Sequence, residues 1–274
     1  MDVMESTVGV EESAALVKAR ISKRQLLQPA VSRVRAFAAT DTSSPTKELD
    51  AVVLGNTLVG YGANISLENM AIIENLIKFS KLEASYEVPG DDPEAWYLAF
   101  LKCMDDAGCF VADSGYTSYQ KSSHQLTMDN IVTDIVKAGV NAAKAAIPGA
   151  AILGAIADST LDALKAKPEA INLYSSEVIN SKGVRLAVMP CDQLANGIIL
   201  TSLVSIDSVD GNRKKAPVFF DWKTSGVDIF RGSSFITFNP LRYAELKGDL
   251  EEYLGQHFKA ALSNRFQRRK NAVK

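Results

Sequence analysis

Cys191 is the residue whose surroundings point most directly to chemistry. It follows the apolar run 184–190 and precedes the turn residues Asn196 and Gly197. This pattern predicts a strand that ends at Cys191, where Pro190 would hold the thiol near a sheet edge. A thiolate accepts acyl groups well, and adjacent apolar helices could supply a channel for a fatty chain. The alternative interpretation is an inert core group, because an unmodified thiol behaves as a small hydrophobe.

The other thiols and the histidines give weaker signals. Cys103 and Cys109 lack the second Cys or His pair that a zinc site needs, so no metal is expected. His124 and His257 have no carboxylate or cysteine partner at a fixed spacing, which favours exposed or internally satisfied imidazoles. His124 could serve as a general base only if folding brought a nucleophile to it.

Several common mechanisms have no signature in the sequence. We find no Gly-x-Ser-x-Gly elbow, phosphate-binding loop, dinucleotide fingerprint or HExxH helix. The acidic pairs are adjacent in sequence, and so do not define the opposed carboxylates of a glycosidase; solvated helix ends explain them. These pairs are Asp91-Asp92, Asp105-Asp106 and Glu251-Glu252.

Composition bounds the class of protein and its partners. The 274 residues are 47% hydrophobic and 23% charged, which excludes a wholly disordered or collagenous chain. Thirty Lys and Arg against 32 Asp and Glu give a net charge of −2, so nucleic acid is not an expected partner. The basic tail at 268–274 lacks interleaved aromatic residues and is typical of a solubilising end.

The N-terminus and the cysteine count indicate the compartment. The first thirty residues open acidic and contain no apolar segment of the secretory type, so a cytoplasmic location is expected. Three cysteines are too few for a disulfide scaffold in a chain of this length. The alternatives are attachment at the membrane periphery and export without a classical signal peptide.

The sequence predicts a single α+β domain at 11–274 after a flexible tail at 1–10. Its helical part is expected at about 11–167, its β-rich part at about 168–238 and a closing helix at about 239–267. The helical part is expected to pack on an antiparallel sheet. The helices are predicted at 11–39 with a break near Pro29, from Pro45 to Tyr61, from Ser66 to Ser85, and from Pro93 to Gly108.

The later segments are predicted in the same way. The segment 110–126 is expected to be a loop with one strand at 116–121, and 128–147 and 150–166 form a helical hairpin around Pro148 and Gly149. The β-rich part should contain strands at 184–189, 198–206, 218–222, 227–230 and 235–238, with a hairpin turn at 210–212. A last helix is predicted from Leu241 to about Phe266.

The helical hairpin offers a second functional interpretation. The uncharged stretch 145–157 is rich in Ala, Ile and Gly, like the membrane-penetrating elements of toxins. It is shorter than the about 20 apolar residues that span a bilayer as a helix, so it would insert only at the interface. The alternative is a buried helix pair whose small residues permit close packing.

The order of these features resembles the Evf-like bacterial virulence factors, which promote persistence in the insect gut. The matching features run over most of the chain. They are a basic first helix, the Gly-containing helix 49–55, the helix from Ser66, Trp96-Tyr97, 116–121, Met189-Pro190-Cys191 and 220–223. The resemblance implies an α/β fold of unusual topology in which a palmitate-like fatty acid is attached by a thioester to a buried cysteine, with its chain in a hydrophobic cavity. Cys191 fits that cysteine. The resemblance also implies a link to the membrane and an acyl thioesterase or acyltransferase activity.

Physical chemistry is consistent with such a buried chain. Each methylene that leaves water contributes about 0.8 kcal/mol, so a C16 chain would be held firmly in a cavity, whereas one exposed chain anchors only reversibly. The expected function is therefore virulence-associated handling of a fatty-acyl group on Cys191, with an acyl thioester as the partner. The alternatives are a membrane-acting toxin that uses 128–166 and a non-enzymatic interaction protein with inert thiols.

Overall fold

The structure is a computed structural model that describes residues 8–24, 34–37, 50–119, 138, 151–168, 170–172, 174, 178, 186–209 and 228–256. Its helices are α1 (Val10–Ser22), α2 (Leu67–Glu87), α3 (Pro93–Asp106), α5 (Ala151–Lys165), the 3-10 helix η1 (Pro240–Glu245) and a helix at 247–256. Its strands are β1 (Val34–Phe37), β2 (Asp50–Leu54), β3 (Thr57–Tyr61), β4 (Phe110–Tyr119), β5 (Leu186–Gln193), β6 (Ile199–Val209) and β7 (Asp228–Phe238).

The strands form one seven-stranded sheet in the order β1-β2-β3-β5-β6-β7-β4. All neighbouring pairs are antiparallel except β3 and β5, which are parallel. The sheet is therefore mixed, and its first three strands come from the part of the chain that was expected to be helical. The α+β class is confirmed. Helices and strands are less separated along the sequence than predicted, because strands also occur in the N-terminal part.

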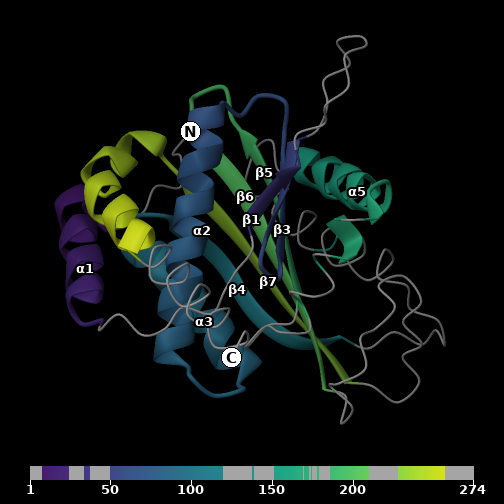
Figure 1. Ribbon diagram of the computed structural model, residues 1–274, viewed down its shortest axis with the longest axis horizontal. Helices are drawn as coiled ribbons and strands as arrows, with labels where there is room; N and C mark the ends of the chain where they lie inside the picture. Colours follow the sequence, from purple (N-terminus) through teal and green to yellow (C-terminus); the bar gives the residue numbers. More distant parts are fainter. Residues whose placement is uncertain are drawn as a thin grey trace, which may run out of the picture.

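Helices cover both faces of this sheet (Figure 1). The side chains of α2, α3 and η1 share one apolar cluster with one face, while α5 shares a second cluster with the other face. Along β5 the two clusters alternate, because Met189 and Cys191 belong to the first and Val188 to the second. This is the period-two alternation expected of a strand that is buried on both sides.

The helix predicted from Pro45 to Tyr61 is wrong from residue 50 onward, where β2 and β3 form a hairpin. The two strands are joined at Gly55 and Asn56, and Gly55 has a φ of 61°, which glycine adopts without steric penalty. Val52, Val53 and Val59 lie in these strands, and β-branched residues favour a strand over a helix.

The prediction for 11–39 is confirmed only in its first half. The helix α1 ends at Ser22, and 34–37 form β1, which pairs with β2 from Val34↔Leu54 to Phe37↔Ala51. An edge of the β2–β3 hairpin supplies the hydrogen-bonding partners that make an extended segment favourable here.

The two helices with clear capping signals are confirmed. The Ser66 hydroxyl accepts a hydrogen bond from the Asn69 amide at 3.2 Å and begins α2. The Asp92 carboxylate accepts from the Ala95 amide at 3.0 Å, with Pro93 in the first turn of α3. These side chains satisfy amide groups that have no partner within the helix.

The last strands are longer than predicted. The strand β4 covers 110–119, and β7 is one strand at 228–238 where two short runs were expected. Gly232 interrupts the apolar pattern of β7, yet it is needed there, because a Cβ would lie 2.7 Å from ring atoms of Tyr97. The predicted last helix begins as η1, and the runs 128–137, 210–212, 218–222 and 257–266 lie outside the described residues.

Candidate functional site

The candidate nucleophile lies in the interior of the sheet. Cys191 is in β5, opposite Tyr61 of β3 on one side and Thr201 of β6 on the other. The prediction that it ends a strand near a sheet edge is wrong, because Asp192 and Gln193 continue the pairing with β6 and β3 covers the other edge of β5. Two neighbouring strands therefore fix the position of the thiol.

The Cys191 side chain belongs to a row that crosses the sheet on the face covered by α2 and α3. The register places Tyr61, Cys191, Thr201, Ile236 and Val111 in line across five strands. All of them except Thr201 belong to or pack against the apolar cluster on this face, and Cys191 is 0% exposed. The sulfur lies inside an apolar layer.

Hydrogen bonds hold the thiol in place. The Cys191 Sγ donates to the Thr201 Oγ1 at 3.1 Å, and this hydroxyl donates to the Pro190 carbonyl oxygen at 2.9 Å. The Met189 carbonyl oxygen lies 3.5 Å from the sulfur. The thiol proton therefore has an acceptor, which is the arrangement of a neutral thiol rather than of a thiolate.

Burial also favours the neutral thiol. Removal from water raises the pKa of Cys191 to about 12; the hydrogen bond with Thr201 lowers it and the charge of Asp192 raises it. Because the thiolate is the nucleophilic form, a thiol with this pKa is weakly reactive at neutral pH. The buried thiol is therefore poorly suited to repeated nucleophilic attack.

Asp192 follows Cys191 and occupies the opposite face of β5. A Cβ on Gly62 would lie 2.3 Å from Asp192 Oδ1 and 3.1 Å from Ile156 Cδ1, so this carboxyl lies where β3 and α5 meet. Its Oδ1 is buried and has no hydrogen-bond partner among the described residues. Burial raises the pKa of Asp192, whereas a hydrogen bond with the Gln193 backbone lowers it. The sequence analysis did not single out this carboxyl, although strand alternation next to Cys191 would have placed it.

The other two cysteines are also buried. Cys103 lies in α3 and Cys109 follows that helix; both are free thiols with no exposed surface. Burial raises the pKa of Cys103 to about 12 and also raises that of Cys109. In the described ranges no group of three or more His, Cys, Asp or Glu side chains is arranged to hold a metal ion.

The histidines and the first helix of the predicted hairpin are not placed. His124 and His257 lie outside the described residues, as do 128–137 and 139–147. The second helix of the hairpin is observed as α5, which buries Leu153, Ile156 and Leu161 against the sheet. Among the helices that the structure describes, none has both the length and the apolar character needed to cross a bilayer. The toxin interpretation stays a prediction.

A cluster of charged side chains around the buried Glu83 and Asp106 joins α1 to α2 and α3, and the sequence analysis missed it. Arg20 binds Asp106 and Glu87, while the Arg24 Nε and Nη2 donate to Glu83 at 2.9 and 2.8 Å. The Tyr253 hydroxyl also donates to Glu83, at 3.0 Å. The prediction that the Asp105-Asp106 pair is a solvated helix end is therefore wrong for Asp106. The arginines and their partners are far apart in sequence, so spacing gave no signal.

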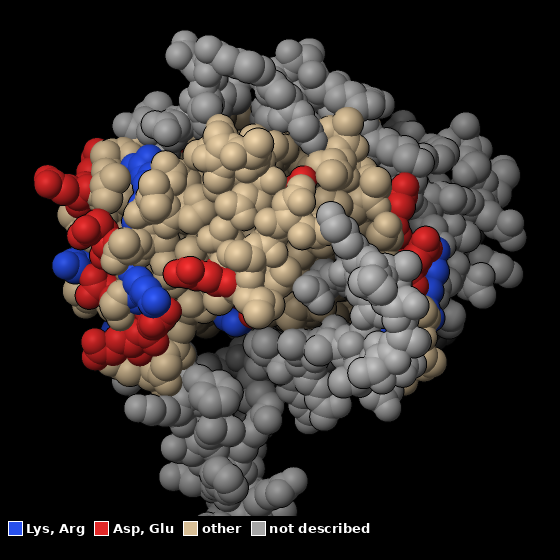
Figure 2. Space-filling view, turned by 90° about the horizontal axis from the view of Figure 1, so that it is seen from above, with Lys and Arg blue, Asp and Glu red and all other residues tan. Residues whose placement is uncertain are grey.

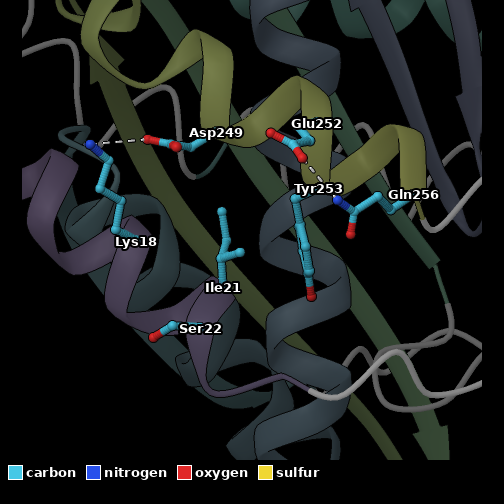
Figure 3. Close-up of a pocket in the computed structure, with 7 residues that line it drawn as sticks. All are labelled: Lys18, Ile21, Ser22, Asp249, Glu252, Tyr253 and Gln256. Carbon is cyan, nitrogen blue, oxygen red and sulfur yellow. Dashed lines mark hydrogen bonds and ion pairs between the residues drawn. The ribbon is translucent and has the colours of Figure 1, made fainter.

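Two of the cavities that are lined by described residues stand out, and neither contacts Cys191. One, of about 10 Å³, lies between Trp96, Tyr97, Phe100 and the sheet and has room for a single water molecule at most. The other, of about 250 Å³, lies between α1 and the helix at 247–256 (Figure 3).

We find no family model, no curated protein and no solved structure that matches this chain. The case for a site at Cys191 therefore rests on the burial, hydrogen bonding and strand position of its sulfur.

Proposed function

We propose that the protein carries a fatty-acyl group as a thioester on Cys191. The observation that carries this proposal is the complete burial of the sulfur within an apolar layer between the sheet and α2 and α3. A thioester there would be shielded from the water that would hydrolyse it. Neither of the two cavities adjoins the sulfur, so an acyl chain would enter this layer only by displacing its side chains, and each methylene that leaves water would contribute about 0.8 kcal/mol.

The chemistry of the sulfur favours a stable carrier over an acyl thioesterase or acyltransferase. Turnover requires a thiolate that meets substrate or water in every cycle. Burial raises the pKa of Cys191 to about 12, and its proton is donated to Thr201. These two features slow attack by the free thiol, while exclusion of water by burial would protect a thioester once it had formed.

Acyl transfer would need a donor that is itself a thioester. The Cys191 sulfur attacks the acyl carbon, the new S–C bond replaces the one in the donor, and the thiol proton passes to the leaving thiolate. Because the sulfur is 0% exposed, this exchange would precede the closure of α2 and α3 over β5, and the acylated protein would hold these helices farther from the sheet.

Intact mass of the purified full-length protein tests the proposal. The wild type should carry an acyl-sized mass increment that hydroxylamine removes, and Cys191→Ser should lack it. Cys103→Ser is the matched control, since Cys103 is equally buried, and it should keep the increment. A wild-type mass equal to that of the bare chain before hydroxylamine would exclude stable acylation.

A further inference from the structure

The larger cavity lies between two helices from opposite ends of the chain. It has a volume of about 250 Å³ and is lined by Lys18, Ile21, Ser22, Asp249, Glu252, Tyr253 and Gln256. Figure 3 shows these side chains around an open space between α1 and the helix at 247–256. Ligand pockets of ordinary size are about 300–1,000 Å³, so this one suits a small compound.

One wall of the cavity is apolar and held in place. Ile21 supplies an aliphatic surface from α1, and Tyr253 supplies a ring from the other helix. The Tyr253 hydroxyl donates to Glu83 at 3.0 Å, and its ring meets Phe79 edge-on with centroids 5.8 Å apart. Because the hydroxyl and the ring of Tyr253 are both held by neighbours, this wall is preorganised for an aliphatic stem.

The rim of the cavity carries two carboxylates on one helix face. Asp249 and Glu252 are three residues apart, which places their Cβ atoms about 5–6 Å apart. Lys18 Nζ lies 3.5 Å from Asp249, with the two side chains 63% and 40% exposed, so this pair contributes little to stability. Glu252 accepts a hydrogen bond from Gln256 at 3.1 Å, and no Lys or Arg of the described segments pairs with it.

The neighbouring surface carries charges of both signs. Figure 2 shows acidic side chains together with Lys and Arg side chains at the edge of the molecule where α1 and the C-terminal helix lie. The nearby arginines Arg20 and Arg24 are bound to Asp106, Glu83 and Glu87 and do not line the cavity.

We propose that this cavity binds a short aliphatic diamine in its doubly protonated form. One ammonium takes the place of Lys18 at Asp249, the other binds Glu252, and the methylenes lie along Ile21 and Tyr253. Lys18 itself shows that a primary ammonium on an aliphatic stem fits this rim. The second carboxylate selects a dication over a monoamine. This site is independent of any chemistry at Cys191.

Calorimetric titration of the full-length protein with putrescine tests the proposal. Putrescine should bind saturably, n-butylamine at least tenfold more weakly, and neutral 1,4-butanediol not at all. Raising the salt concentration should weaken the binding of putrescine, because two exposed carboxylates carry it. Absence of saturable putrescine binding, or equal binding of the monoamine, would overturn the proposal.

Three variants distinguish this cavity from a general attraction of cations. Glu252→Gln should weaken putrescine binding at least tenfold. Lys18→Gln should strengthen it several-fold, because the internal competitor for Asp249 is gone. Glu251→Gln is the matched control, since Glu251 is exposed on the same helix and does not line the cavity, and it should bind like the wild type. Equal losses in the Glu251 and Glu252 variants would overturn the assignment.

Discussion

At the scale of single residues, the environment of each thiol decides its reactivity more than its place in the sequence does. Sequence reasoning identified Cys191 as the candidate and expected it at a strand end near a sheet edge. The register instead places Cys191 in β5, with β3 on one side and β6 on the other. The Thr201 hydroxyl accepts the hydrogen bond of its thiol. This could not be derived beforehand, because the pairing of β3 with β5 joins segments far apart in the chain.

All three thiols should be unreactive in the folded protein. Cys103, Cys109 and Cys191 are buried, and burial raises the pKa of each. Ellman's reagent should therefore give no rapid reaction under native conditions. In denaturant it should count three thiols in the unmodified chain and two in a chain acylated on Cys191. Rapid reaction of a native thiol that Cys191→Ser abolishes would contradict the buried position of this sulfur.

Asp192 should make stability fall as pH rises. Its pKa is raised by burial, so the folded state binds this proton more tightly than the unfolded state. The contribution is present below the ordinary Asp pKa of about 3.9 and is lost as pH rises through the higher folded pKa. Urea unfolding from pH 3.5 to 7 should show a wild-type stability that declines relative to Asp192→Asn. A wild-type stability that stays constant or rises with pH relative to Asp192→Asn would contradict a raised pKa for Asp192.

At the scale of elements, the sequence predicted correctly those helix starts that depend on residues within one turn. The caps of α2 and α3 were predicted because Ser66 and Asp92 act within one helical turn. The β2–β3 hairpin was missed because its apolar residues also fit a helical stripe, and the preference of its valines for a strand decides the structure only together with pairing to β5 and β1. In β7 two short strands were predicted, but the strand continues through Gly232, which makes room for a ring from α3.

The attachment of α1 illustrates a stabilising device that periodicity does not reveal. Only Ser13 and Val17 of this helix are buried, and two arginines fix its end to carboxylates. Glu83 is 0% exposed, so Glu83→Gln should lower the free energy of unfolding by about 3–5 kcal/mol, as loss of one partner of a buried pair does. Urea denaturation measures this loss.

The control for that experiment is a partly exposed pair on the same helix. Glu74 and Lys78 form an i,i+4 pair at 3.0 Å on α2, and Glu74→Gln should cost no more than about 0.5 kcal/mol. Similar losses of unfolding free energy in the Glu83 and Glu74 variants would show that burial of Glu83 adds nothing to the stability that its ion pairs provide.

At the scale of the whole molecule, the sheet brings together parts of the chain that are distant in sequence. The central parallel pair joins 57–61 to 187–191, and the helices that cover Cys191 come from 67–106. Contacts of such long sequence separation form late, because closing a long loop costs entropy before the contact stabilises the chain. The layer over Cys191 is therefore open in the unfolded chain and closed in the native protein.

This order of assembly leads to a prediction about when Cys191 is acylated. Native, unmodified protein incubated with palmitoyl-CoA should stay unmodified, because its sulfur is 0% exposed and protonated. Protein that refolds from denaturant with the same donor should gain one hydroxylamine-sensitive acyl group, seen by intact mass, and Cys191→Ser should gain none. Acylation of the native protein as fast as of the refolding chain would mean that α2 and α3 open readily, and the carrier would then exchange its acyl group with the solution instead of sealing it within the fold.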